Sequence, residues 1–223
     1  MKNNWFQNPI VILLALVIFA TWSNTPACAE KKTVRIAYEE WSSEIASTNL
    51  VKAVIREELG HKCIIKRMSV TDMYEAITNK TQDAMLAAWL PGQQTYYDKY
   101  KDGIDDLGPN LKGGRLGLVV PQVSSTWLLA QDGQHTVPYM KIDSIEEIKD
   151  HYDEFNGKII GIESDSGMMT IMREKLIPAY GLEMFELVAG NEVTMTAQLA
   201  EAIKRKEWIV VLGWEPHWMF GRW

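Results

Sequence analysis

The chain has 223 residues, of which 47% are hydrophobic and 23% are charged, and its formal net charge at pH 7 is −6. This composition is that of an ordinary globular protein, and the length suits one or two domains. The net negative charge argues against a nucleic-acid partner.

The first 29 residues have the pattern of a secretory signal peptide. Lys2 supplies a short positively charged start, residues 10–20 are apolar but too few for a membrane span, and Ala27-Cys28-Ala29 matches a small-residue cleavage site. We therefore expect export and soluble release into the periplasm. The alternative is a lipid anchor at Cys28 on the outer face of the membrane. Cleavage after Ala29 leaves Cys63 alone, so no intramolecular disulfide is expected.

Two apolar stretches each end in a tryptophan that is followed closely by a proline. The first ends in Ala88-Trp89-Leu90-Pro91 and the second in Gly213-Trp214-Glu215-Pro216. Because proline removes a ladder donor, each strand is expected to stop there, at the sheet edge where α/β proteins bind ligands. Two indoles in such positions predict an aromatic box for a cation that cannot be hydrogen-bonded, such as a quaternary ammonium group. The alternative for each tryptophan is core packing at a strand end.

The hydrophobic pattern predicts an α/β architecture on both sides of a strand at 116–121. Before that strand, the predicted strands and helices alternate in the order 33–38, 43–59, 63–68, 72–77 and 84–89. After it, they alternate in the order 158–162, 168–176, 185–188, 194–204 and 208–212. A capping box at Ser144 and Glu147 predicts one more helix. The order before residue 116 implies a parallel sheet, and the order after it implies a second α/β unit.

The turn after the first predicted strand brings a helix N-terminus to the mouth of the sheet. Trp41 follows the strand, and Ser42 and Ser43 can cap a helix that ends at Gly60. The free N–H groups and the dipole of such a helix make a carboxylate site without a cationic side chain. The alternative is a plain strand–helix turn without a ligand.

These motifs together resemble the glycine betaine/proline betaine substrate-binding proteins of ABC transporters. The resemblance runs from about Lys32 to Trp223 in the family's order and is carried by Trp41–Asn49, Ala88–Pro91, Asp106–Gly108, Gly117–Pro121 and Gly213–Trp218. It implies a two-lobed α/β fold of the periplasmic-binding-protein type II, with a ligand cleft between the lobes. The expected parts are a signal peptide (1–29), lobe 1 (30–116), lobe 2 (117–213) and a cleft motif (214–223).

The resemblance implies an extracytoplasmic component of an ABC importer, without a cofactor. It would capture glycine betaine or a related quaternary ammonium osmolyte and deliver it to a membrane permease and, through the permease, to its ATPase. Trp89 and Trp214 are expected to form cation–π walls, with Trp41 beside them. The ligand carboxylate is expected at the helix N-terminus formed by Glu44, Ile45 and Ala46, with His217 next to it. The alternative for His217 is a strand-end residue whose ring is bound by backbone.

Two features depart from the family pattern. Residues 123–137 look like an insertion. Family members continue past Trp218 with a further strand, a return crossover and C-terminal helices, and a third box tryptophan is expected in that missing part. The chain is therefore expected to be truncated, and a non-functional truncated paralogue is one alternative. A small hydrolase using His217 and Glu215 is another, although no nucleophile elbow accompanies them.

No metal site is expected from the sequence. The four histidines are scattered, and no metal-ligand spacing emerges from them. Met168, Met169 and Met172 lie at helical spacing and are interpreted as core residues rather than as soft-metal ligands.

Overall fold

The computed structural model describes residues 30–121 and 140–223. The predicted signal peptide, with Cys28, and the predicted insertion at 123–137 lie outside these described residues. Residues Thr33–Trp223 form one compact unit. Over the two described ranges, no helix combines the length and the apolar character that crossing a membrane requires.

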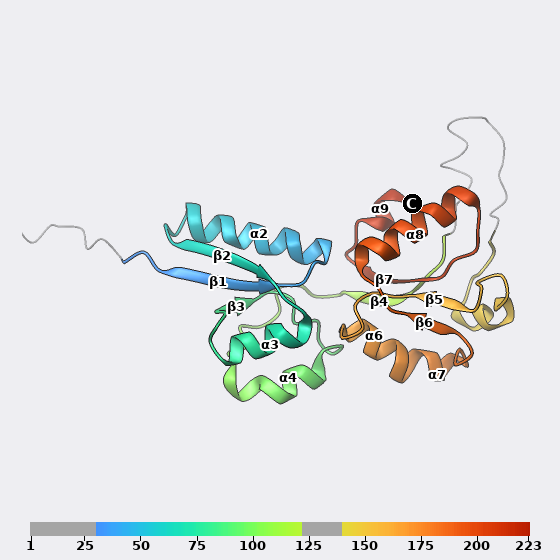
Figure 1. The fold of residues 1–223 in the computed structure, drawn as a ribbon, viewed down its shortest axis with the longest axis horizontal. Coiled ribbons are helices and arrows are strands. Elements are labelled where there is room, and N and C mark those ends of the chain that lie inside the picture. The colour runs from blue at the N-terminus through green and yellow to red at the C-terminus, as the bar shows by residue number, and fades with distance from the viewer. Residues whose placement is uncertain (1–29, 122–139) are drawn as a thin grey trace, which may run out of the picture. The chain divides into compact units, whose positions relative to one another are not determined.

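A three-stranded parallel sheet forms the first part of this unit. Its strand order is β2-β1-β3, with β1 at Thr33–Tyr38, β2 at Lys62–Arg67 and β3 at Ala84–Met85. Helix α2 (Ser42–Glu57) lies on one side of the sheet, and α3 (Val70–Thr78) and α4 (Gln94–Tyr100) lie on the other (Figure 1). A short 3-10 turn, Lys101–Gly103, follows α4. The predicted parallel sheet is confirmed.

The third predicted strand is shorter than expected. Strand β3 ends at Met85, and the carbonyl of Leu86 accepts a hydrogen bond from Asn110 Nδ2 at 2.9 Å instead of pairing with another strand. Trp89 therefore lies in an irregular segment rather than at a strand end, and a cis peptide bond joins Leu90 to Pro91. Apolar side chains alone did not reveal this difference, because a strand and an extended loop show the same local pattern.

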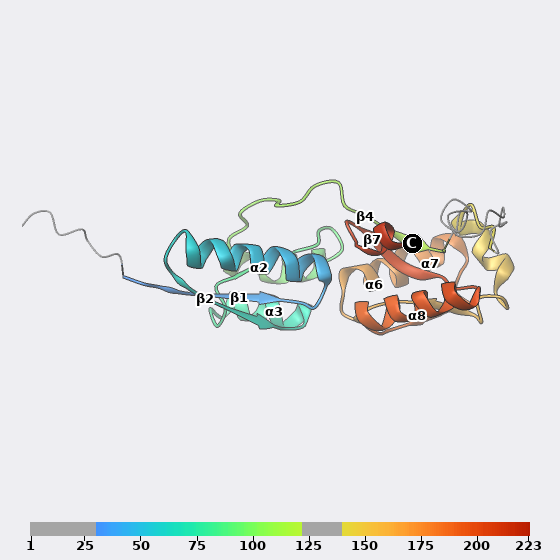
Figure 2. The same ribbon diagram turned by 90° about the horizontal axis from the view of Figure 1, so that it is seen from above.

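A mixed four-stranded sheet forms the second part. Its order is β4-β7-β5-β6, with β4 at Arg115–Val119, β5 at Lys158–Ile160, β6 at Glu186–Val188 and β7 at Val211–Glu215. Strand β4 runs antiparallel to β7, and the other pairs are parallel. Helices α8 (Glu192–Arg205) and α9 (Met219–Arg222) lie on one side of this sheet (Figures 1 and 2).

The other side of the second sheet carries one helical segment with a change of winding. It consists of α6 (Gly167–Ile171), a π-helical turn (Met172–Leu176) and α7 (Ile177–Tyr180), and it ends at Gly181 in the left-handed conformation with φ 65°. Figure 1 shows this segment on the side of the sheet opposite α8. Ser166 caps it, since its Oγ accepts from the backbone N–H of Met169.

The predicted capping box at Ser144 is wrong. Ile145–His151 form a 3-10 helix, and the side chain of Ser144 makes no capping hydrogen bond. The Ser144 hydroxyl instead donates to Glu147 Oε1 at 3.2 Å. Helix α8 has the capping box that the sequence analysis missed, because Asn191 accepts from the N–H of Thr194 while the Thr194 hydroxyl accepts from the N–H of Asn191.

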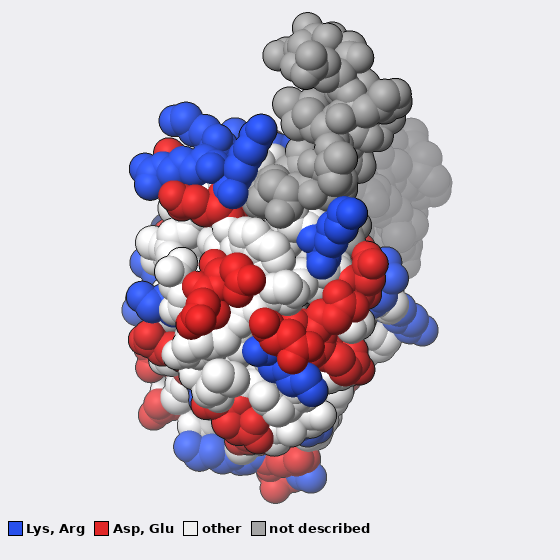
Figure 3. Space-filling model, turned by 90° about the vertical axis from the view of Figure 1, so that its right-hand side faces the viewer, with Lys and Arg blue, Asp and Glu red and all other residues white. Residues whose placement is uncertain are grey.

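Met168, Met169 and Met172 belong to the hydrophobic core, as predicted from their helical spacing. Met169 and Met172 are each 1% exposed, and Met195 from α8 is fully buried with them. Met168 is different because its side chain reaches a cavity that is described below. Glu39, Glu44 and Glu192 are buried. On the surface, the face in Figure 3 carries acidic side chains across its middle and basic ones mostly near its margins.

Candidate ligand-binding site

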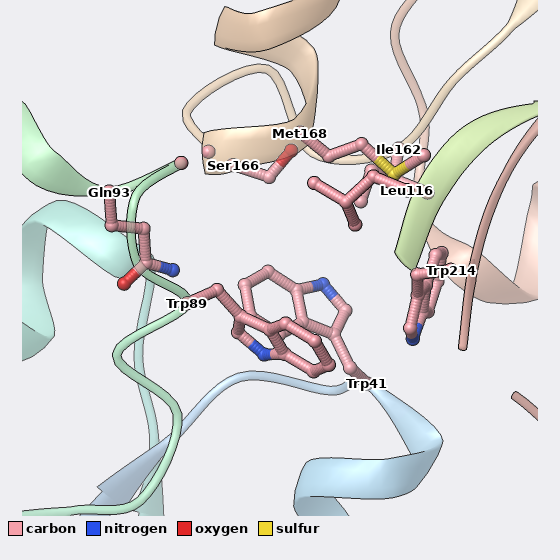
Figure 4. Close-up of a pocket in the computed structure, with 10 residues that line it drawn as sticks. Trp41, Trp89, Gln93, Leu116, Ile162, Ser166, Met168 and Trp214 are labelled. Atoms are coloured by element: carbon pink, nitrogen blue, oxygen red, sulfur yellow. The ribbon is translucent and has the colours of Figure 1, made fainter. Parts of the chain in front are cut away.

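Three tryptophans from distant parts of the chain meet around one cavity, which we call the tryptophan cavity (Figure 4). Trp41 precedes α2, Trp89 follows β3, and Trp214 belongs to β7. The volume of the cavity is about 30 Å³, which is room for about two water molecules, so the rings lie close together in this structure. The residues that line it are Trp41, Trp89, Gly92, Gln93, Leu116, Ile162, Ser166, Gly167, Met168 and Trp214.

The indole of Trp41 is held at its edge by a carboxylate. Its Nε1 donates to Glu163 Oε2 at 2.9 Å, and the residue is only 4% exposed. This hydrogen bond uses the only polar atom of the ring. Trp41 therefore lines the cavity with the carbon atoms of its indole. The electron-rich face of an indole attracts cations, and a desolvated contact of this kind is the strongest.

Trp214 is positioned by its strand and by a neighbouring histidine. The antiparallel register of β4 and β7 places Trp214 opposite Leu116, which also lines the cavity. The His217 ring packs against the indole edge-on, with 4.4 Å between ring centroids and an interplanar angle of 82°. Trp214 therefore has one fixed orientation, as a preorganised binding wall requires.

His217 does not line the tryptophan cavity. Its Nδ1 accepts the backbone N–H of Met219 at 3.1 Å, which matches the alternative interpretation of a ring bound by backbone. Its Nε2 lies 3.1 Å from Glu192 Oε1, although the direction is unfavourable for a hydrogen bond. The hydrolase alternative would pair His217 with Glu215, but the Glu215 carboxylate instead accepts from Arg115 Nε at 2.7 Å.

The carboxylate of Glu192 joins α8 to the start of α2. Its Oε2 accepts the backbone N–H of Ser42 at 2.7 Å, and its Oε1 accepts Trp218 Nε1 at 2.9 Å. Burial opposes ionisation, but the side chains of His217 and Trp218 and the backbone N–H of Ser42 outweigh it, so the pKa of Glu192 lies below its ordinary value. The N-terminus of α2 therefore binds a carboxylate, but this carboxylate is the side chain of Glu192 and not a ligand.

The predicted carboxylate site at Glu44, Ile45 and Ala46 does not join the tryptophan cavity. The backbone N–H of Ile45 donates to the carbonyl of Trp41 at 2.8 Å, so this group is already paired within α2. Ile45 and Ala46 are exposed. A ligand contact at the backbone of Glu44 stays a prediction.

The side chain of Glu44 is buried beside a second, larger groove. This groove is lined by residues of α2, by the segment 86–92 and by residues 110–114, and it shares Trp89, Gly92 and Leu116 with the tryptophan cavity. Glu44 is 2% exposed, and no described residue hydrogen-bonds to either of its carboxyl oxygens. Burial, with a smaller contribution from the charge of nearby Glu39, raises the pKa of Glu44 to about 8.

The sequence analysis missed the polar and apolar residues that complete the cavity. Gln93 is two positions after Pro91, and neither it nor Ser166 was singled out as a site residue. Leu116, Ile162 and Met168 are apolar residues in predicted strands and helices, and such a pattern is the same whether a side chain faces the core or a cavity. Only the three tryptophans were indicated in advance.

In residues 30–121 and 140–223, no three histidine, cysteine, aspartate or glutamate side chains come together as a metal site would require. A model of the substrate-binding domain of ABC-type glycine betaine transport systems matches residues 32–223. The chain belongs to this family. The family consists of transport substrate-binding proteins rather than enzymes.

Individual members of this betaine-transport family are similar to the chain over parts of their length. The glycine betaine/carnitine transport binding protein GbuC of Listeria monocytogenes serotype 1/2a is 38% identical over 104 residues, which are 46% of this chain and 34% of that protein. The chain thus spans about a third of the length of this curated relative.

Solved structures support the fold. Lactococcal OpuAC, in its closed conformation with glycine betaine, is 35% identical with a TM-score of 0.73, over 86% of this chain and 68% of that chain. An ABC-transporter choline binding protein in complex with choline is 29% identical with a TM-score of 0.69, over 86% of this chain and 62% of that chain. The predicted two-lobed α/β fold of a periplasmic binding protein is confirmed.

Proposed function

We propose that this chain is the extracytoplasmic component of an ABC importer that captures glycine betaine or a related quaternary ammonium compound. It would then deliver the ligand to a membrane permease and, through the permease, to its ATPase. The observation that carries the proposal is the meeting of Trp41, Trp89 and Trp214 around one cavity. Similarity to proteins whose names state glycine betaine or choline supports the same ligand class.

The chemistry of the cavity suits a methylated ammonium group. Such a cation has no N–H to donate, so its recognition depends on aromatic faces and apolar contact rather than on hydrogen bonds. Leu116, Ile162 and Met168 supply further apolar surface, and among the described residues no charged side chain lines the cavity. A small metal cation or an ordinary primary amine would lose its hydration there without compensation.

Isothermal titration of the purified protein with glycine betaine, proline betaine, carnitine and choline tests this function. We expect saturable binding of at least one of them. As a control, 3,3-dimethyl-1-butanol has the shape of choline without its charge, and it should bind at least about tenfold more weakly than choline. Absence of binding by all four compounds, or equal binding of choline and its neutral isostere, contradicts the proposal.

Export and soluble release complete the proposed function. The support for export is the signal-peptide pattern of residues 1–29 together with the transport family of the chain. Cell fractionation distinguishes soluble release from the alternative lipid anchor at Cys28. The chain should appear in the osmotic-shock fluid, whereas recovery with membranes that is abolished by Cys28→Ala would favour the anchor.

A further inference from the structure

Gln93 has an unused hydrogen-bond donor inside the tryptophan cavity. The residue is fully buried, and its Oε1 accepts the hydroxyl of Tyr74 at 3.2 Å. Its Nε2 has no hydrogen-bond partner among the described residues. A buried amide N–H₂ without a partner costs free energy, so such a group in a native structure calls for an acceptor from elsewhere.

The orientation of the Gln93 amide is held by a rigid neighbour. Tyr74 is fully buried and stacks on Tyr96 and Tyr100, with ring centroids 5.8 and 6.2 Å away. Burial raises the pKa of Tyr74 to about 12, so its hydroxyl remains a donor. The carbonyl oxygen of Gln93 is thereby directed to Tyr74, and Figure 4 shows its amide nitrogen on the side of the indole rings.

The other polar group of the cavity also has a hydrogen to donate. Ser166 is 1% exposed, and its Oγ already accepts the N–H of Met169 at 3.3 Å. Besides this bond, the hydroxyl has one hydrogen to donate and one further lone pair. Among the side chains that line the cavity, polar atoms other than the indole N–H groups belong only to Gln93 and Ser166, so the polar part of the cavity offers donors and lacks a carboxylate.

We infer that Gln93 is a specificity-determining residue, which donates its Nε2–H to the acceptor end of the ligand and makes the cavity prefer a carboxylate-bearing betaine over choline. This inference rests on the proposed function, since it assumes that the ligand's ammonium group lies among the tryptophans. A carboxylate only accepts, and a hydrogen bond to it is charge-assisted. The hydroxyl of choline has a hydrogen that needs an acceptor. Leaving a polar group unpaired in a buried site costs binding free energy, and this cost discriminates against choline relative to a betaine.

Replacing the amide by a carboxylate of the same shape tests the inference. In Gln93→Glu we expect the affinity for glycine betaine to fall at least about tenfold relative to that for choline, because a donor becomes an acceptor that repels the ligand carboxylate. The matched control is Gln94→Glu. It adds the same charge at the next residue, which is exposed and does not line the cavity, and should change the ratio less than about twofold.

A second variant covers the case in which a buried glutamate prevents folding. Gln93→Met keeps the length of the side chain without a donor or a charge, and should weaken glycine betaine binding while choline binding changes little. Tyr74→Phe removes the hydrogen bond to the amide oxygen of Gln93, so the amide is no longer held in place. It should also weaken glycine betaine binding, but less than Gln93→Met does. Calorimetry with both ligands, and thermal melting of each variant, provide the readouts.

The outcomes separate the inference from the proposed function. If the parent protein binds none of the four compounds, the proposed function fails, and the inference fails with it. If the parent binds a quaternary ammonium compound but prefers choline, or if Gln93→Met lowers both affinities equally, the inference is overturned and the proposed function stands. A preference for glycine betaine that is lost in Gln93→Met and retained in Gln94→Glu supports it.

Discussion

The backbones of Gly92 and Gly167 lie in direct contact at the wall of the tryptophan cavity. A Cβ atom added to Gly167 would lie 2.5 Å from the carbonyl carbon of Gly92 and 2.7 Å from its oxygen. Gly92 lies in the segment after β3 of the first sheet, and Gly167 is the first residue of α6, which packs beside the second sheet. The contact therefore connects the two parts of the fold. No side chain larger than hydrogen fits at Gly167 while the contact is kept.

Gly167→Ala should therefore weaken ligand binding. Overpacking costs about 1–3 kcal/mol, which corresponds to a loss of about fivefold or more in affinity if the contact closes the cavity around the ligand. Gly221→Ala is the matched control, since a Cβ there meets no atom within 4 Å. Titration calorimetry of both variants measures the difference, and unchanged affinity in Gly167→Ala would show that the contact does not matter for binding.

The tryptophan walls should respond to the loss of the ring more than to its replacement by another ring. Trp89→Ala or Trp214→Ala should weaken binding about 30-fold, because a desolvated cation–π contact is worth about 2 kcal/mol. Phenylalanine at either position should recover part of that loss. Trp223→Ala removes an indole outside the cavity and serves as the control. Equal affinities of the Phe and Ala variants would mean that the indoles only pack.

Glu192 should stabilise the fold in a pH-dependent way. Since its pKa is lowered in the folded state, its contribution is present above the ordinary carboxyl pKa of about 4.3 and is lost as the pH falls through the folded value. Glu192→Gln should lower the free energy of unfolding at pH 7 by about 1–3 kcal/mol, with a smaller deficit near pH 3. Glu201→Gln removes the same charge from an exposed position of α8. Thermal melts of both variants at both pH values measure this deficit. A loss of stability that does not change with pH would show that the charge of the Glu192 carboxylate is not its cause.

Glu44 should behave in the opposite way. Its folded pKa of about 8 exceeds the ordinary value of about 4.3, so the folded state binds more protons and stability declines as the pH rises between these values. Glu44→Gln should then be more stable than the parent at pH 8 by at least about 1 kcal/mol, or about 2–4 °C in melting temperature. Glu57→Gln, on the exposed side of the same helix, should show no such gain. A Glu44→Gln variant that melts below the parent at pH 8 would contradict the assignment.

The α/β architecture could be predicted from the sequence because the apolar patterns of strands and helices involve residues that are close together in the chain. Alternating apolar residues in β1 and the 3.6-residue spacing in α3 are visible in the chain itself. The same patterns failed at Ser144, where a serine three residues before a glutamate matches a capping box without making one. Capping depends on the backbone conformation of the turn, which the residue types constrain only weakly.

The sequence by itself showed that Trp89 and Trp214 each end an apolar stretch just before a proline, which was enough to predict an aromatic box. Only the tertiary structure decided which polar groups accompany them. It places Glu192 at the N-terminus of α2, where a ligand carboxylate was expected, and it turns His217 towards backbone and Glu192. It also leaves the Nε2 of Gln93 unpaired in the cavity. A hydrogen-bond partner far along the chain is chosen by the packing of the two sheets, and no local pattern encodes that choice.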